Sequence, residues 1–269
     1  MILQYARETH PKNTPVHVKD VTIGSNKVVI IAGPCAIENE EQMRTTAQAV
    51  KKYGGHILRG GAFKPRTSPH SFSGLGKEGL EMLAKIGKEV DLPTITEILD
   101  PRDREMIETY ADIIQVGSRN MQNIALLKEL GKSKKPVLLK RGMAATIQDF
   151  LLAAEHILLA GNPQVILCER GIRTFETDTR NTLTLATIPL IKELSHLPII
   201  VDPSHATGKR SLIASMTKAA VAAGADGVMI DVHSDPSAAR CDGEQAILPE
   251  EFENLVHDMR RVAVAVDRT

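Results

Sequence analysis

The sequence predicts an α/β fold, a single (β/α)8 TIM barrel, because one pattern recurs through it. Eight times a short apolar run ends in a polar or glycine-rich tip, and a helix-like segment follows. The starts of these runs fall 19 to 37 residues apart, close to the length of one βα unit. Such apolar runs are typical of parallel strands that are covered on both faces. Eight units in one chain indicate a closed barrel with its active site at the C-terminal strand ends.

The strands and helices of this barrel can be assigned in chain order. The predicted strands are Val28–Pro34, His56–Phe63, Pro93–Leu99, Asp112–Ser118, Val137–Gly142, Val165–Gly171, Ile199–His205 and Gly227–His233. The segments between them carry apolar residues at helical spacing, and several end at a glycine, as at Gly131 and Gly161. The predicted helices are Glu40–Tyr53, Leu80–Val90, Arg102–Tyr110, Ile124–Leu130, Ile147–Leu159, Leu183–Leu194, Leu212–Ala223 and Pro249–Val264.

The first strand is preceded by a short segment, so the chain divides into an N-terminal extension (1–26) and a catalytic barrel (27–269). The extension contains Pro11 and Pro15 and an alternating stretch, Val16–Lys19. This alternation predicts a β-hairpin that caps the bottom of the barrel, and the alternative is a frayed tail. A chain of 269 residues leaves little for a second domain.

Composition and charge exclude several classes of protein. Hydrophobic residues make up 42% of the chain and aromatic residues 3%, which predicts an aliphatic core. Lys plus Arg equals Asp plus Glu, 33 each, so the overall charge gives no case for nucleic acid or a membrane surface as partner. No segment is long and apolar enough for a transmembrane helix or a secretory signal. Three cysteines form no disulfide framework, so we expect a cytoplasmic protein.

Basic residues gather at the predicted C-terminal strand ends although the chain as a whole is neutral. They follow strands two, four, five and six: Arg59, Lys64, Arg66, Arg119, Lys140, Arg141, Arg170 and Arg173. Concentrated positive charge in a cleft needs an anionic partner, and phosphate or carboxylate groups supply it. For any single residue the alternative is an ordinary surface ion pair with an acid such as Glu97 or Glu169. Their recurrence at one topological position favours a site for more than one anionic group.

A second set of residues suits a metal ion. Cys35, His205, Asp231 and Asp242 follow or end strands one, seven and eight, which are neighbours in a closed barrel. One thiolate, one imidazole and two carboxylates can bind a divalent transition metal such as Mn, Fe, Co or Zn. The spacing is not a motif, so a buried structural cysteine and an Asp202–His205 hydrogen bond remain alternatives.

Five runs match the motifs of one enzyme family in the same order. They are Ile31–Cys35 (IAGPC), Leu58–Pro69 (LRGGAFKPRTSP), Val137–Gly142 (VLLKRG), Cys168–Gly171 (CERG) and Asp202–His205 (DPSH). From about Val28 to the last helix the chain resembles the 3-deoxy-D-arabino-heptulosonate 7-phosphate (DAHP) synthases, class I, short β subtype. The resemblance implies condensation of phosphoenolpyruvate with erythrose 4-phosphate, the first step of the shikimate route to aromatic amino acids. It also implies one divalent metal, no organic cofactor, and a homo-oligomer, by family a tetramer.

The resemblance further implies a role for each candidate site residue. Arg59 and Lys64 would bind the phosphoenolpyruvate carboxylate, and Arg66 and Thr67 the phosphate of erythrose 4-phosphate. The residues for the phosphoenolpyruvate phosphate are Gly117, Ser118, Arg119, Lys140 and Arg170. Lys64 would be a general acid, and we expect its cationic neighbours to lower its pKa. The implied catalytic set is Cys35, Lys64, Glu97 and His205, and the implied metal ligands are Cys35, His205, Asp231 and Asp242.

Two other functions are weighed against this one. The sister enzyme, 3-deoxy-D-manno-octulosonate 8-phosphate synthase, takes arabinose 5-phosphate, and its loop typically reads Lys-Ala-Asn-Arg. Here the loop is Lys64–Thr67 (KPRT), and proline restricts how far the loop reaches, which favours the shorter sugar. The family usually has Glu where this chain has Asp231, so a non-catalytic anion sensor is the other alternative. No regulatory domain fits beside the barrel, so we expect no inhibition by aromatic amino acids.

Overall fold

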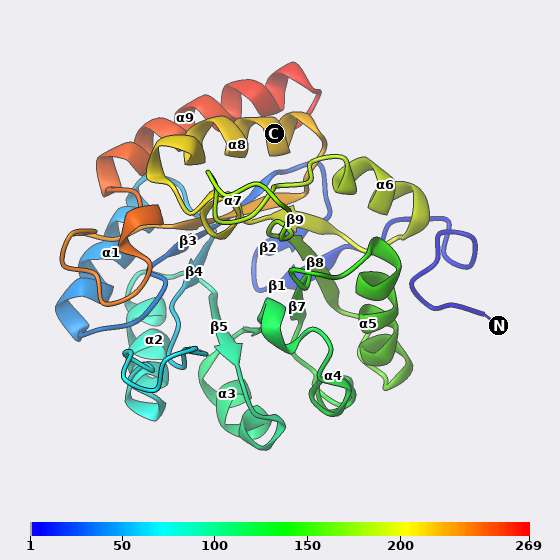
Figure 1. Cartoon of the computed structure of the whole chain (residues 1–269), viewed down its shortest axis with the longest axis horizontal. Coiled ribbons are helices and arrows are strands. Elements are labelled where there is room, and N and C mark those ends of the chain that lie inside the picture. Colours follow the sequence, from blue (N-terminus) through cyan, green and yellow to red (C-terminus); the bar gives the residue numbers. More distant parts are fainter. Residues whose placement is uncertain (1) are drawn as a thin grey trace.

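The computed structural model describes residues 2–269. Within them, parallel strands close into an eight-stranded barrel that helices surround (Figure 1). The strands are β3 (Val29–Gly33), β4 (Ile57–Arg59), β5 (Thr94–Ile98), β6 (Ile113–Val116), β7 (Val137–Lys140), β8 (Val165–Glu169), β9 (Ile199–Val201) and β10 (Gly227–Asp231). β10 pairs with β3, with Asp231 opposite Gly33, and this pairing closes the sheet. Each strand lies inside the apolar run predicted for it, and the TIM-barrel prediction is confirmed.

The helices form the outer layer of the barrel (Figure 1). They are α1 (Glu40–Lys52), α2 (Lys77–Glu89), α3 (Arg104–Tyr110), α4 (Ile124–Leu130), α5 (Ile147–Leu159), α6 (Thr187–Leu194), α7 (Pro203–Thr207), α8 (Arg210–Ala222) and α9 (Pro249–Ala265). The described part of the chain also forms short 3-10 helices: η1 (Pro101–Asp103), η2 (Ser118–Asn120) and η3 (Gly243–Gln245). None of the helices formed by residues 2–269 has the length and apolar character needed to cross a membrane.

Some helix bounds differ from the predicted ones for local reasons. α6 begins at Thr187 rather than Leu183, because Thr182 forms a β-bridge with Ile172 that keeps the chain extended before the helix. The predicted strand Ile199–His205 was wrong in its last part, since β9 ends at Val201 and Pro203–Thr207 forms α7. Its first turn is capped by Asp202, whose Oδ1 accepts a hydrogen bond from the His205 N–H at 2.9 Å. This cap fixes the position of His205 at the end of β9.

Two apolar cores hold the barrel together. The strand side chains that point into the barrel form one buried cluster: Val29, Ile31, Ile57, Ile95, Ile113, Leu138, Ile166, Cys168, Ile200 and Met229. A larger cluster fills the space between the strands and the helices and includes Phe150 and Phe252. Because the barrel interior is filled with apolar side chains, the polar residues of the strands gather at the strand ends.

A β-hairpin closes the N-terminal end of the barrel. β1 (Val16–Val18) pairs antiparallel with β2 (Val21–Ile23), and its apolar side chains belong to the same buried cluster as the barrel interior. Lys19, in the turn, forms an ion pair of 2.9 Å with Asp112, which precedes β6. The predicted capping hairpin is confirmed. The division of the chain at residue 26 stays a prediction.

Candidate active site

A polar cavity of about 360 Å³ opens at the C-terminal ends of the barrel strands. Its walls come from the strand ends and the loops that follow them, as expected for this fold. All nine residues predicted to bind substrate line it: Arg59, Lys64, Arg66, Thr67, Gly117, Ser118, Arg119, Lys140 and Arg170. Glu97, His205 and Asp242 line it as well. The sequence therefore predicted the place of these residues, and the structure brings them together.

The cavity carries an excess of positive charge. Seven basic residues line it, Arg59, Lys64, Arg66, Arg119, Lys140, Arg170 and Arg180, together with the carboxylates of Glu97 and Asp242. Two more carboxylates are buried beside the cavity, Asp231 paired with Arg59 and Asp202 paired with Lys140, so seven basic residues stand against four acids. Arg170 is only 5% exposed, and burial lowers the pKa of its guanidinium. Its Nη1 and the Oγ of Ser118 are buried without a hydrogen-bond partner among the described residues. Unpaired buried donors are costly, so this cavity is built to receive anionic groups.

Two of the basic residues predicted at the strand ends, Arg141 and Arg173, do not line the cavity. Arg141 does not line the cavity; its Nη1 donates to Glu169 Oε2 at 2.8 Å and to Thr187 Oγ1 at 3.1 Å. This buried pair joins β8 to α6, so the structural alternative holds for Arg141. Arg173 is exposed and also lies outside the cavity lining. Both follow a strand end, but neither is among the residues that line the cavity.

Lys64 lies between the cavity and Cys35. Its Nζ donates to the carbonyl oxygen of Cys35 and to the Sγ of Cys35, both at 3.0 Å. Burial lowers the pKa of Lys64, but the charges of Cys35 and Glu97 outweigh burial and raise that pKa to about 12. The expectation of a lowered pKa was wrong, because anionic partners lie closer to Nζ than the neighbouring cations. Lys64 is therefore a protonated donor at neutral pH.

Glu97 is held at the cavity wall by a close approach of the backbone. The Nε2 of Gln115, from β6, donates to Glu97 Oε2 at 3.4 Å. A Cβ atom on Gly117 would lie 2.0 Å from Glu97 Oε1, so only glycine leaves room for the carboxylate at this place. Gly117 precedes η2, which begins at Ser118, and both residues line the cavity. The acid and the predicted phosphate-binding turn thus depend on each other.

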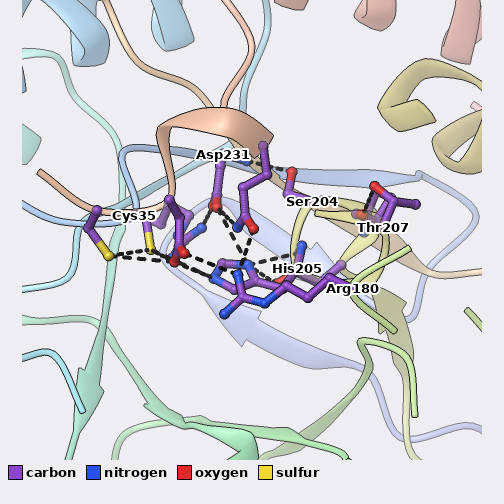
Figure 2. A network of polar contacts seen from close by, with 12 residues as sticks. Cys35, Arg180, Ser204, His205, Thr207 and Asp231 are labelled. Atoms are coloured by element: carbon purple, nitrogen blue, oxygen red, sulfur yellow. Dashed lines mark hydrogen bonds and ion pairs between the residues drawn. The ribbon is translucent and has the colours of Figure 1, made fainter. Parts of the chain in front are cut away.

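Three of the predicted metal ligands, Cys35, His205 and Asp242, converge beside the cavity. Figure 2 shows Cys35 and His205 within this network of polar contacts. The Sγ of Cys35 lies 3.6 Å from His205 Nε2 and 3.1 Å from Asp242 Oδ2, and the last two atoms are 3.7 Å apart. His205 Nδ1 faces Asp202 Oδ2 at 3.0 Å, an arrangement that orients Nε2 toward a metal in many metalloproteins. The donor set of one thiolate, one imidazole and one carboxylate fits a divalent transition metal.

The carboxyl of Asp202 contacts two basic side chains, those of Lys140 and His205. Its Oδ2 forms an ion pair with the Nζ of Lys140, and both groups are buried. Burial acts to raise the pKa of Asp202, but the charges of His205 and Lys140 hold that pKa well below its usual range. The structural Asp202–His205 contact that the sequence offered as an alternative therefore exists. It is compatible with metal binding, because Nδ1 of His205 faces Asp202 while Nε2 faces Cys35 and Asp242.

The fourth predicted ligand, Asp231, does not join this group. Its Oδ1 pairs with the buried Arg59, and its Oδ2 accepts a hydrogen bond of 2.6 Å from Gln245 Nε2. Oδ2 lies 3.5 Å from His205 Nδ1, whereas Cys35 and Asp242 face Nε2. The short aspartate arm and the buried charge of Arg59 keep the carboxylate on the Nδ1 side. Its role as a metal ligand stays a prediction.

Sequence reasoning missed four residues near the site. Gln115 and Arg180 line the cavity, Gln245 contacts Asp231, and Cys241 lies beside Cys35. Arg180 Nη1 donates to Asp242 Oδ1 at 3.0 Å and to Gln245 Oε1 at 2.8 Å. Gln115 sits on a predicted strand near its tip, a position that could have indicated it. Arg180 and Cys241 lie in loops, and Gln245 lies in the short helix η3, segments whose path the sequence pattern does not specify.

The thiol of Cys35 has an unusual electrostatic environment. The hydrogen bond with Cys241 acts first, and with the charge of Lys64 it holds the pKa of Cys35 well below its usual range. The same hydrogen bond and burial raise the pKa of Cys241. Cys168, in contrast, is enclosed in the barrel core, where burial raises its pKa. Of these three thiols, Cys35 is the one that readily becomes a thiolate.

Comparisons with known proteins identify the family. Residues 11–268 match the model of the DAHP synthetase I family. A phospho-2-dehydro-3-deoxyheptonate aldolase of Thermotoga maritima is 49% identical over 261 residues, which are 97% of this chain and 77% of the relative. A 2-dehydro-3-deoxyphosphooctonate aldolase of Desulfotalea psychrophila is 31% identical, over 94% of this chain and 98% of the relative.

A solved structure gives the same result. The crystal structure of the Thermotoga maritima phospho-2-dehydro-3-deoxyheptonate aldolase (DAHP synthase) matches with a TM-score of 0.97 and 48% sequence identity. The match covers 99% of this chain and 78% of that one. The family model and the first relative each cover nearly the whole chain. The chain therefore belongs to the DAHP synthetase I family.

Proposed function

We propose that this chain condenses phosphoenolpyruvate with D-erythrose 4-phosphate and water to give DAHP and inorganic phosphate. The 49% identity to an aldolase of that specificity supports the proposal. The structural observation that carries it is the cavity, where seven basic residues outnumber the four carboxylates in or beside it, and where Arg170 Nη1 and Ser118 Oγ are buried without a partner among the described residues. Two phosphorylated substrates, one with a carboxylate, bring enough negative charge for such a cavity.

The basic residues divide between the two substrates. Arg59 and Lys64 bind the phosphoenolpyruvate carboxylate. Its phosphate is bound by a group at the ends of β6, β7 and β8: Gly117, Ser118, Arg119, Lys140 and Arg170. Arg66 and Thr67, in the loop after β4, bind the phosphate of erythrose 4-phosphate. The unpaired Nη1 of Arg170 and Oγ of Ser118 support this division, because a phosphate oxygen would satisfy both.

Carbon–carbon bond formation comes first in the proposed mechanism. C3 of phosphoenolpyruvate attacks the aldehyde carbon of erythrose 4-phosphate, and the aldehyde oxygen becomes an alkoxide. Lys64 holds a proton at Nζ and donates it to that oxygen, which balances the new charge. Its raised pKa of about 12 keeps Lys64 protonated before the reaction, so it acts as an acid and not as a base. The cavity supplies the orientation that brings C3 and the aldehyde together.

Release of phosphate completes the reaction. Water adds to C2, and Glu97, with Gln115 beside it, holds this water and accepts its proton. The bond between C2 and the phosphate oxygen then breaks, its electron pair leaves with the phosphate, and the proton of the new C2 hydroxyl passes to the departing phosphate. Arg119, Lys140 and Arg170 stabilise the charge that develops on the leaving group. The carbonyl at C2 of the product forms in the same step.

One divalent metal completes the proposed site. Cys35, His205 and Asp242 would hold it, and it would polarise the aldehyde as a Lewis acid. A thiolate among the ligands favours the softer ions of the group Mn, Fe, Co and Zn, without selecting one. Metal removal with a chelator should lower the rate, and the divalent ion that restores it identifies the metal.

The octulosonate alternative has weaker support. A relative of that name is 31% identical, against 49% for the heptonate aldolase. Pro65 precedes Arg66 at the cavity wall, where the restricted proline backbone holds the loop that would contact the sugar phosphate. A cavity wall fixed there favours the four-carbon substrate over the longer arabinose 5-phosphate.

Consumption of phosphoenolpyruvate with each sugar phosphate tests the proposal. The metal-loaded protein should consume it with erythrose 4-phosphate and at least about tenfold more slowly with arabinose 5-phosphate. Equal or reversed rates would assign the chain to the sister reaction. No consumption with either sugar, despite binding of phosphoenolpyruvate, would favour an anion sensor.

Two further sequence-based expectations accompany the function. We expect a homo-oligomer, with the tetramer as the family-based expectation, and a cytoplasmic location. Sedimentation of the purified protein measures the first, and fractionation of the source cell measures the second.

A further inference from the structure

We propose that Cys241 is the fourth protein ligand of the metal, so that the ion in this chain is bound by two thiolates. The inference rests on the proposed function, because it concerns the same metal site. None of the motifs that mark the family includes this residue. Cys241 precedes Asp242 in the loop after β10, and its side chain is 5% exposed. The structure thus places a second soft donor next to the predicted ligands.

The distances around Cys241 carry the argument. Its Sγ lies 3.7 Å from the Sγ of Cys35 and 3.5 Å from Asp242 Oδ2. Both cysteines are free thiols. Two sulfurs bound at about 2.3 Å to one tetrahedral ion are about 3.75 Å apart, and a sulfur and an oxygen about 3.5 Å. The separations of the Cys241 sulfur from these two ligands therefore match a shared tetrahedral metal.

The predicted ligand Asp231 is less suited to this position. It faces the Nδ1 atom of His205, and both of its oxygens have partners, Arg59 and Gln245. Moving it to the Nε2 side would leave the buried Arg59 without its counter-charge, which is costly. Cys241 lies beside Cys35 and Asp242, the two ligands that face Nε2. Its thiol must move closer to His205 to complete the set, since the group of donor atoms within 4.8 Å of one another holds Cys35, His205 and Asp242. The shorter aspartate and the extra thiol thus complement each other.

Each sulfur has its own cationic donor. Lys64 Nζ lies 3.0 Å from the Sγ of Cys35, and Arg66 Nη1 lies 2.9 Å from the Sγ of Cys241. Two thiolates and one carboxylate around a divalent ion leave one net negative charge, and these two cations compensate it. Arg66 also belongs to the loop assigned to erythrose 4-phosphate, so the second thiolate links that loop to the metal.

The loop that carries Cys241 is fixed by its neighbours. Asp242 has a φ of 54°, in the left-handed region, and a Cβ on Gly243 would lie 2.2 Å from the Pro236 carbonyl oxygen. The N–H of Arg240 donates to Glu38 Oε1 at 2.7 Å, and its guanidinium lies 3.8 Å above the Phe72 ring. These contacts hold the Cys241–Asp242 pair toward Cys35, as a metal site requires.

The test uses cobalt, because Co(II) bound to thiolate absorbs in the near-ultraviolet in proportion to the number of sulfur ligands. Co(II) is titrated under reducing, anaerobic conditions into the wild-type protein and into Cys35→Ser, Cys241→Ser, Asp231→Asn and Cys168→Ala. The last is the matched control, since Cys168 lies in the barrel core. Circular dichroism checks that each variant is folded.

The expected result is a sulfur-to-cobalt band that falls to roughly half in Cys241→Ser and in Cys35→Ser, with at least about tenfold weaker Co(II) binding. Cys168→Ala and Asp231→Asn should keep the full band. A band of unchanged intensity in Cys241→Ser would overturn the inference, and a large loss of affinity in Asp231→Asn would return the fourth position to Asp231.

A second measurement on the wild-type protein needs no variant. Bound Co(II) or Zn(II) should protect both Cys35 and Cys241 from alkylation, as peptide mass spectrometry would show. Protection of Cys35 alone would contradict the inference while leaving the metal of the proposed function in place. If neither thiol is protected and no sulfur band forms, the metal assignment itself fails. Formation of DAHP tests the reaction independently of either outcome.

Discussion

Arg141 and Arg170 follow neighbouring strands, but their surroundings give them different roles. Arg141, after β7, is neutralised by Glu169 and also donates from Nε to the Ala145 carbonyl at 3.0 Å. Arg170, after β8, is buried with an unpaired Nη1 in the cavity. Both are about 5% exposed. Arg141 therefore stabilises the fold, whereas the guanidinium of Arg170 is available to bind an anionic ligand.

We expect Arg170→Met to lower kcat/KM for phosphoenolpyruvate by at least about 100-fold, the usual effect of removing a donor to developing charge. The melting temperature of the Arg170→Met variant should equal or exceed that of the wild type, because the substitution removes a buried charge that has no close counter-ion. Initial rates of phosphate release and thermal unfolding measure the two effects. A full rate in the variant would remove Arg170 from the phosphate site.

Arg141→Met serves as the matched comparison, and its effect should fall on stability. Removing Arg141 leaves the buried Glu169 carboxylate unpaired, which typically costs about 3–5 kcal/mol of unfolding free energy. Urea denaturation measures this loss. If the folded variant retains wild-type stability, the Arg141–Glu169 pair does not hold β8 and α6 together in the way the distances indicate.

At the scale of single elements, β3 and β4 are joined by a histidine. The Nδ1 of His56, which precedes β4, accepts a hydrogen bond from the Ile30 N–H at 3.0 Å. Burial, and after it the charge of Lys27, lower the pKa of His56 from its ordinary 6.5 to about 4. The neutral ring is therefore the form that belongs to the folded barrel.

This histidine should make the barrel less stable in acid. The folded pKa lies below the unfolded one, so the unfolded chain binds the extra proton, and stability is lost as the pH falls from about 6.5 to about 4. The slope contributed by His56 is up to about 1.4 kcal/mol per pH unit. His56→Asn keeps an acceptor for Ile30 and should remove this slope in urea unfolding measured across that range. His257→Asn, at an exposed position, should leave it unchanged.

The barrel strands could be predicted from the sequence more completely than the helices. Apolar runs such as Val165–Glu169 need burial on both faces, and this need alone located all eight barrel strands. Helix starts were less certain, because they depend on local contacts such as the Thr182–Ile172 bridge before α6. The short helix α7 depends on the cap that Asp202 provides, a contact without hydrophobic periodicity.

The candidate site was predictable in its place but not in its contacts. Residues at strand ends, such as Arg59 and Lys140, must meet at one end of a closed barrel, so topology located them. The contacts between these side chains could not be predicted in the same way. Asp231 pairs with Arg59, and Cys241 contacts Cys35, although the partners lie far apart in the sequence. Spacing does not encode these contacts, and hence the raised pKa of Lys64 could not be anticipated.

At the scale of the whole molecule, the two ends of the barrel differ in structure: one is closed by apolar side chains and the other opens into the polar cavity. The hairpin of β1 and β2 seals the N-terminal end with apolar side chains, and the cationic cavity occupies the opposite end. The chain carries equal numbers of basic and acidic residues, so the positive charge of the cavity is local. Local charge of this kind concentrates anionic substrates at one opening without making the protein generally basic.

We propose that phosphoenolpyruvate and erythrose 4-phosphate react at this opening. Phosphorus NMR of the metal-loaded protein with both substrates tests it most directly, because it follows every phosphate group at once. We predict that the two substrate signals fall together while inorganic phosphate and one sugar phosphate rise in equal amounts, and that omitting either substrate stops the change. Unchanged spectra with both substrates, or phosphate release without loss of erythrose 4-phosphate, would contradict the account.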